Sequence, residues 1–199
     1  MTPDSIKKLV ALLSQLPSLG PRQATRVAFH IAGMPTSEVT ELARVINETA
    51  RLKRCTQCFR IDELTTGRCT ICANPRRDQA SIIIVEKETD VLTLEKTKAI
   101  KGRYLVLGDL PKDGVLTTQQ RTRLAALKKS IADLPGGIAS EIIIGFSPTT
   151  YGDLNAEIVA GQIKGITQKI SRLGRGIPTG GEIEFADEQT LDAAIKNRN

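Results

Sequence analysis

The feature that most constrains this chain is a group of four cysteines, which are all of its cysteines. They form two Cys-x-x-Cys pairs, Cys55-Thr-Gln-Cys58 and Cys69-Thr-Ile-Cys72, with ten residues between them. Two such pairs supply four thiolates to a tetrahedral ion, and a structural Zn²⁺ site uses this all-sulfur set with no position left open for water. Two disulfides, four unrelated thiols and an iron–sulfur cluster are the alternatives. We therefore predict a structural zinc site.

A short segment of this 199-residue chain is predicted to bind a zinc ion of its own. Such a chain is expected to consist of several small units rather than one large domain. Its longest uncharged run, residues 9–21, is too short to span a bilayer. The first ten residues lack the layout of a signal peptide. We therefore expect a cytoplasmic protein with no membrane segment.

The net charge of +6 is concentrated in the first part of the chain. Residues 1–80 carry 12 Lys/Arg against 7 Asp/Glu, whereas residues 81–199 carry 16 against 15. Such an excess favours phosphate-rich partners, and an ordinary solvated basic face is the alternative. Aromatic residues make up only 3% of the chain, so contact with a nucleic-acid backbone is expected rather than base stacking.

The first part of the chain is predicted to form a helical hairpin. Apolar residues recur at helical spacing in residues 5–16 and again in residues 21–32, with a short Pro- and Gly-containing turn between them. Arg22 and Arg26 are four apart and share one face at the start of the second helix, where free N–H groups and the helix dipole favour phosphate. This pattern predicts contact with a DNA backbone, against the alternative of two solvated arginines.

A third helix is predicted between this hairpin and the cysteines. Gly33 and Pro35 end the second helix, and Thr36 or Ser37 is suited to cap the third. Its expected buried side consists of Val39, Leu42, Ile46 and Ala50.

After residue 78 the pattern changes to alternating strands and helices. Uninterrupted apolar runs predict buried parallel strands at residues 82–85, 104–107 and 142–144. Helical patterns follow them around residues 91–98, 124–134 and 158–166. A last helix from Glu188, capped by Asp187, is expected to be buried through Leu191, Ala194 and Ile195. The fold class is therefore α/β and multidomain, with a mostly parallel sheet.

Carboxylates follow each of the three predicted strands. Glu86 ends the first strand, and Asp109 and Asp153 follow the second and the third. The carboxyl ends of parallel strands share one edge of a sheet, where open α/β proteins build their sites. Convergence of these carboxylates there would make an oxygen-ligand site for Mg²⁺, and solvated or capping carboxylates are the alternative.

The order of these parts resembles the RecR family of bacterial recombination mediators over nearly the full length. The segments that carry the resemblance are Ala28-Phe-His30, the two cysteine pairs, Arg77-Asp78, Ile84-Val-Glu86 and the glycine-rich residues 172–181. The resemblance implies four parts: a helix–hairpin–helix region at residues 1–53, a four-cysteine zinc finger at 54–79, a Toprim domain at 80–171, and a C-terminal segment with a helix at 172–199.

The resemblance also implies a function. Members of the family are non-enzymatic mediators that act with RecO, and RecF is a further candidate partner, to load the recombinase at single-strand gaps in DNA. Subunits would join through the hairpin and the tail into a dimer or a tetrameric ring. Partner docking would involve the edge of the Toprim sheet, with Glu86, Asp109, Tyr151 and Asp153.

Two positions depart from the family pattern. Ser18 stands where a helix–hairpin–helix usually has its first glycine, in a turn that needs a positive φ. Tyr151 stands where the family's Asn-Pro-x-x-Glu-Gly has glutamate, which removes one candidate metal ligand and alters the surface that would meet RecO. A Mg²⁺-dependent Toprim nuclease or strand-transfer enzyme, with Glu86 as acid or base, is the alternative function, and a zinc-stabilised scaffold that binds only protein is a third.

Overall fold

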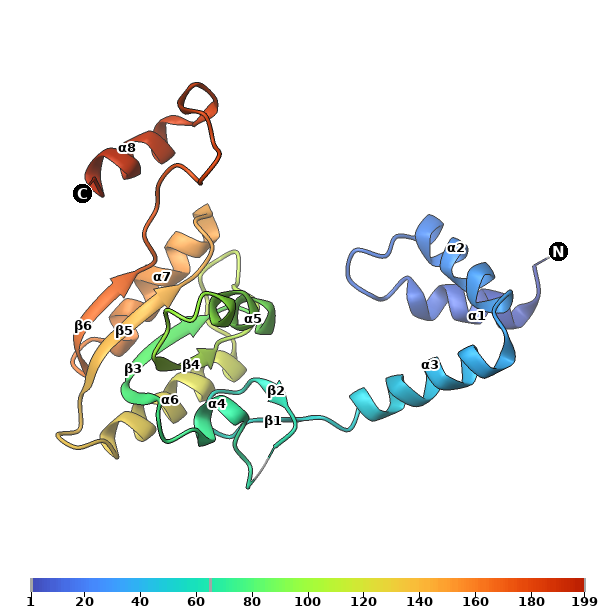
Figure 1. Cartoon of the computed structure of the whole chain (residues 1–199), viewed down its shortest axis with the longest axis horizontal. Coiled ribbons are helices and arrows are strands. Elements are labelled where there is room, and N and C mark those ends of the chain that lie inside the picture. The colour runs from blue at the N-terminus through green and yellow to red at the C-terminus, as the bar shows by residue number, and fades with distance from the viewer. Residues whose placement is uncertain (1, 65, 199) are drawn as a thin grey trace. The chain divides into compact units, whose positions relative to one another are not determined.

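The computed structural model describes residues 2–64 and 66–198 (Figure 1). The chain divides into two compact units, Met1–Leu52 and Lys53–Asn199. In the described part of the chain, no helix has the length and apolar character needed to cross a membrane.

The first unit contains the predicted hairpin and third helix. Its helices are α1 (Asp4–Leu13), α2 (Pro21–Ala32) and α3 (Thr36–Thr49). Pro21 is the first residue of α2, where its missing N–H costs no hydrogen bond, and Gly20 precedes it as the N-cap residue. The buried side chains Ile6, Ala24 and Ala28 close the contact between α1 and α2. Two small alanines in this set allow the two helices to approach closely.

The prediction that α3 buries its apolar side is wrong for the single chain. The structure describes every residue of α3 and none of them is buried. Leu42, Val45 and Ile46 are 39%, 43% and 59% exposed, and Ala50, the C-cap residue, is exposed as well. Helical spacing places the first three on one side, so α3 carries an apolar stripe. Periodicity indicates that a stripe is suited to burial, but it does not indicate which chain covers it.

The second unit is built on a four-stranded parallel sheet with the order β4-β3-β5-β6. The strands are β3 (Asp78–Val85), β4 (Gly102–Val106), β5 (Ala139–Gly145) and β6 (Thr167–Arg172). Ile84 of the central strand β3 lies in register with Leu105 on one side and Ile144 on the other. Three of these strands were predicted. The sequence analysis did not predict β6, a mostly exposed edge strand with no apolar run.

Two helices cover one face of this sheet, and one helix and the segment before β3 cover the other (Figure 1). The first face holds α6 (Thr118–Ala132) and α7 (Thr150–Ile163). The second face holds α5 (Glu88–Lys96) and the zinc module, residues 53–77, which contains β1 (Lys53–Arg54), β2 (Ile61–Asp62) and α4 (Thr70–Ala73). Alternation along β3 sends Ile82 and Ile84 to the first core and Ile83 and Val85 to the second. The zinc module is therefore part of a hydrophobic core of the sheet.

The tail after the sheet contains η1 (Ile183–Phe185) and α8 (Glu188–Lys196). The predicted cap is confirmed, because the Asp187 carboxylate accepts the Thr190 N–H at 2.9 Å. The prediction that the apolar side of α8 is buried is wrong, because Leu191 and Ala194 are only half-buried and Ile195 is 61% exposed. Like α3, α8 presents apolar side chains that the sheet does not cover.

Candidate functional site

The four cysteines come together as a candidate metal centre. All are buried and free, and their sulfur atoms lie within 4.8 Å of one another. Cys58 Sγ and Cys69 Sγ are 3.5 Å apart. Four sulfurs at a Zn–S distance of about 2.3 Å lie roughly 3.8 Å from one another, whereas a disulfide needs about 2.05 Å. The geometry fits a tetrahedral ion and does not fit the disulfide alternative.

The chemistry of the donor set also fits a divalent cation. A hydrogen bond from Cys58 lowers the pKa of the Cys55 thiol, and hydrogen bonding to Cys55 raises the pKa of Cys58 and of Cys72. Four crowded, buried sulfurs therefore become thiolates together only when a cation shares their charge. The backbone N–H groups of Cys69 and Cys72 donate to the sulfurs of Cys55 and Cys69, each at 3.4 Å. Zn²⁺ is the ion that best matches such a closed all-sulfur site.

A backbone hydrogen bond and a shared core join the centre to the sheet. The N–H of Val106 on β4 donates to the carbonyl oxygen of Cys58 at 2.9 Å. The four cysteines pack in one core with side chains of β3, β4 and α5, namely Ile83, Val85, Val91, Tyr104 and Val106. A metal bound by these sulfurs would hold this face of the sheet together.

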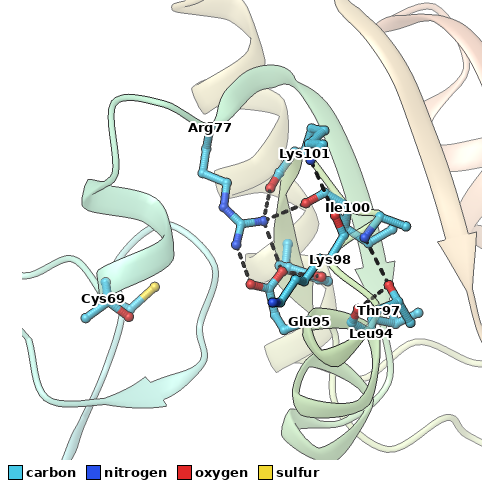
Figure 2. Close-up of polar contacts among 12 residues, drawn as sticks. Cys69, Arg77, Leu94, Glu95, Thr97, Lys98, Ile100 and Lys101 are labelled. Atoms are coloured by element: carbon cyan, nitrogen blue, oxygen red, sulfur yellow. Dashed lines mark hydrogen bonds and ion pairs between the residues drawn. The ribbon is translucent and has the colours of Figure 1, made fainter.

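Arg77 forms a second connection, where the chain leaves the cysteines (Figure 2). Its guanidinium donates to the Glu95 carboxylate on α5, at 3.0 Å from Nη1 to Oε1, and to the carbonyl oxygens of Ile100 and Gly102 at 3.0 and 3.1 Å. The Tyr104 hydroxyl donates to the same carboxylate at 2.7 Å. Burial opposes the ionisation of Glu95, but the hydrogen bonds from Arg77 and Tyr104 outweigh it, so the pKa of Glu95 lies below its usual value. No periodic pattern links positions 77 and 95, so the sequence did not reveal this pair.

Arg22 and Arg26, the residues predicted to contact phosphate, lie on the first turns of α2. Both are exposed on α2, and neither makes an ion pair or hydrogen bond with another residue that the structure describes. The first turn of α2 contains no acidic residue, so nothing there repels an anion. Ser18, in the turn before α2, has a φ of 63°. The turn therefore has the left-handed backbone that explains why glycine is preferred at this position.

The carboxylates at the end of the sheet are not brought together as a metal site. Among the described residues, the four cysteines are the only group of three or more metal-ligating side chains that meet. Glu86 follows β3 and pairs with its neighbour Lys87 at 3.4 Å, while Asp109 follows β4 and is exposed. The expected convergence of Glu86, Asp109 and Asp153 on one ion is therefore absent from the described structure.

Asp153 instead pairs with arginines at the end of the last strand. Arg175 Nη1 lies 3.2 Å from Asp153 Oδ2, and Arg172 Nη1 lies 3.4 Å from Oδ1. The hydrogen bond from Arg175 lowers the pKa of Asp153. These three side chains line a cavity of about 330 Å³ whose walls also include Phe146 and Leu173. The sequence analysis missed both arginines as partners of Asp153 because it did not predict that β6 lies beside β5.

Comparison with known proteins matches the whole arrangement. Family models match as "RecR, helix-hairpin-helix" at residues 6–50, "Toprim domain" at 80–174 and "RecR, C-terminal" at 176–199. The chain is 38% identical over 196 residues to Recombination protein RecR of Acidothermus cellulolyticus, covering 97% of this chain and 95% of that one. It is 37% identical over 201 residues to Recombination protein RecR of Paenarthrobacter aurescens, covering 100% and 98%.

This chain belongs to the RecR family. Membership confirms the resemblance stated from the motifs and agrees with the predicted α/β multidomain fold class, and it supports a role in recombination and repair that involves DNA. The four cysteines lie between the first two matched ranges.

One of the two positions that we expect to depart from the family pattern lies on an accessible surface. Tyr151, in the first turn of α7, is 47% exposed. Lys112 Nζ, in the loop after β4, lies 6.0 Å from the centre of its ring. This is the distance at which a cation and an aromatic face attract each other. In this RecR family member the surface at position 151 is therefore an aromatic ring beside a lysine.

Proposed function

We propose that this protein is a non-enzymatic recombination mediator, which binds gapped DNA and acts with RecO and RecF to load the recombinase at single-strand gaps. The observation that carries the proposal is that Arg22 and Arg26 are exposed on the first turns of α2 and have no ion-pair or hydrogen-bond partner among the described residues. Arg22 and Arg26 combine with the free N–H groups of a helix N-terminus, which is a favourable place for a phosphate. Contact with the backbone alone suits a mediator that acts at gaps of any sequence.

The carboxyl edge of the Toprim sheet is the proposed docking surface for RecO. It includes Glu86, Asp109, Tyr151 and Asp153, which follow successive strands. The separation of the three carboxylates supports a binding role over Mg²⁺ chemistry, and the pairing of Asp153 with Arg175 supports it further. The cavity beside Asp153 gives this surface a recess that a protruding partner side chain would fill.

Assembly of subunits is the proposed reason for the uncovered apolar residues. The stripe on α3 and the exposed Ile183, Phe185 and Ile195 of the tail lie in the two regions through which a dimer or tetrameric ring would form. Replacing Leu42 and Ile46 by Asp is expected to lower the solution mass measured by light scattering. The matched control is Glu41→Asp with Glu48→Asp on the same helix, which should leave the mass unchanged. An unchanged mass in the first variant would contradict this assignment of α3.

The test of the function uses the zinc-loaded protein with Mg²⁺ and end-labelled gapped DNA, analysed on native and denaturing gels from one reaction. The proposal predicts retarded DNA whose strands stay intact. Cut, religated or extended strands would replace it with the Toprim enzyme. Absence of retardation, both alone and with RecO added, would replace it with a protein-binding scaffold.

A further inference from the structure

A groove lies between α6 and α7, on the face of the sheet that the cysteines do not cover. It has a volume of about 440 Å³ and is bordered by these two helices and by the loop that precedes α6. Leu116, Leu124 and Ile158 line it and pack in the core of the sheet, so its floor is apolar. A groove of this size is in the range of protein sites that bind other molecules.

Close packing of the loop against α7 shapes one wall of this groove. Gly114 has a φ of 73°, and a Cβ at this position would lie only 2.7 Å from Cδ1 of Ile158. Glycine therefore allows an approach that a larger residue would prevent. The next residue, Val115, lines the groove and is 61% exposed. The loop thus places an apolar side chain beside the groove without covering it.

The charged residues that line the groove are both basic. Arg121 and Lys128 of α6 border it, and no acidic residue is among its described lining residues. Neither cation makes an ion pair or a hydrogen bond with another residue in the part of the chain that the structure describes. By contrast, Arg172 of β6 pairs with Glu157 of α7 at 2.7 Å. The two cations of the groove are therefore available to an anionic partner.

The positions of the lining residues along α6 match the repeat of a second helix. Arg121, Leu124, Ala125 and Lys128 stand at i, i+3, i+4 and i+7, so they share one side of α6. At about 1.5 Å per residue, the two cations are about 10 Å apart along the helix axis. A helix with two acidic residues seven positions apart, and apolar residues three and four positions after the first, presents the complementary pattern.

We propose that the groove between α6 and α7 binds an amphipathic helix of a partner protein, whose two acidic residues pair with Arg121 and Lys128 and whose apolar residues between them cover the floor. The apolar floor favours a peptide over a nucleic acid, because none of the described lining residues is aromatic and could stack on a base. The site belongs to the second unit, whereas Arg22 and Arg26 belong to the first. It therefore goes beyond the proposed function and does not depend on DNA binding.

The test uses the full-length, zinc-loaded protein and a fluorescent helical peptide with Glu at two positions seven apart and Leu three and four positions after the first. Fluorescence anisotropy measures its affinity for the unsubstituted protein, for Arg121→Glu with Lys128→Glu, and for Lys129→Glu with Lys164→Glu. The last variant is the matched control, because it makes the same change in charge at two exposed lysines of the same unit. A second peptide carries Lys in place of both Glu residues.

We expect Arg121→Glu with Lys128→Glu to weaken binding of the acidic peptide at least about tenfold, because like charges then lie opposite each other. This variant should bind the Lys peptide more tightly than the unsubstituted protein does. The control variant should bind both peptides as the unsubstituted protein does. Equal losses of affinity in the two variants, or no binding of the acidic peptide by the unsubstituted protein, would overturn the proposal. Affinity for gapped DNA should be equal in the two variants, so a failure of this proposal is distinct from a failure of the proposed function.

A further variant tests whether a second copy of this chain occupies the groove instead. The tail contains Ile183 and Phe185, which are exposed and lie between acidic residues. Ile183→Ser with Phe185→Ser should leave the affinity for the acidic peptide unchanged. A clear rise in that affinity would show that the tail competes for the groove and would overturn the assignment to a partner protein.

Discussion

The two units of this chain differ in how far they bury their apolar side chains. Among residues 2–52, only Ile6, Ala24 and Ala28 are buried apolar side chains, and α3 leaves a stripe uncovered. The second unit closes two cores, one on each face of its sheet, and the four cysteines belong to one of them. Stability is therefore concentrated around the sheet and the candidate metal centre. The first unit instead exposes the residues that partners would contact, with Arg22 and Arg26 for DNA and the α3 stripe for another subunit.

Removing one of the proposed metal ligands is expected to have the largest effect on the second unit. Cys58→Ser is expected to abolish stoichiometric zinc and to destabilise the second unit by more than about 4 kcal/mol, because it leaves three thiols crowded in a core. Hydrogen exchange in α1 and α2 should stay unchanged, since no cysteine lies in that unit. Zinc content and thermal melting measure the effect. Thr56→Ser, at an exposed position between the first two cysteines, is the control; retained zinc with unchanged melting in Cys58→Ser would refute a structural site.

A second substitution tests the connection through Arg77. Glu95→Gln should destabilise the second unit by about 2 kcal/mol at pH 7, because it weakens charge-assisted hydrogen bonds from Arg77 and Tyr104. The pKa of Glu95 is lower in the folded protein than in the unfolded chain, where it is about 4.5. The carboxylate therefore contributes its full stabilisation above about pH 4.5, and this stabilisation is lost as the pH falls through the lower pKa of the folded protein.

Denaturant unfolding of both proteins from pH 7 to pH 3 should therefore show a stability difference that shrinks on acidification. Protonation of the cysteines destabilises both proteins alike and does not enter the difference. Glu63→Gln, at an exposed position, should show little difference at any pH. If the difference in the free energy of unfolding between Glu95→Gln and the unsubstituted protein grew towards low pH, it would contradict the direction of the pKa shift.

The smallest expected effect concerns the first unit. Ser18→Gly should stabilise that unit by about 0.5–1 kcal/mol, because glycine adopts a φ of 63° without strain, and this gain exceeds its greater entropy in the unfolded chain. Ser37→Gly, inside α3, should change stability in the opposite direction. Local hydrogen exchange measures the effect of Ser18→Gly in α1 and α2 and the effect of Ser37→Gly in α3. Loss of protection in Ser18→Gly would show that the serine makes a stabilising contact of its own.

The sequence predicted the elements whose signals are local. Uninterrupted apolar runs located β3, β4 and β5, and the cysteine spacing located the four-cysteine cluster, because in each case neighbouring residues carry the whole pattern. β6 was missed because an edge strand beside one neighbour does not require an apolar run.

The side-chain pairs were not predictable in the same way. Arg77 with Glu95, and Asp153 with Arg172 and Arg175, join positions that only the packing of the sheet brings together. The convergence of Glu86, Asp109 and Asp153 was inferred from their shared edge, but an edge four strands wide does not ensure contact. The apolar stripe on α3 was assigned correctly as a stripe and wrongly as part of this chain's own core.

We propose that α2 of the first unit binds DNA through its phosphates, and the salt dependence of binding tests this contact. The affinity for gapped DNA is measured over a series of salt concentrations for the unsubstituted protein, for Arg22→Glu with Arg26→Glu, and for Lys8→Glu with Arg51→Glu, which makes the same change in charge elsewhere in the unit. We predict weaker binding and a slope of log K against log salt that is flatter by about 1.4–1.8 in the α2 variant only. An unchanged slope in that variant, or an equal change in the control, would place the DNA on a different surface.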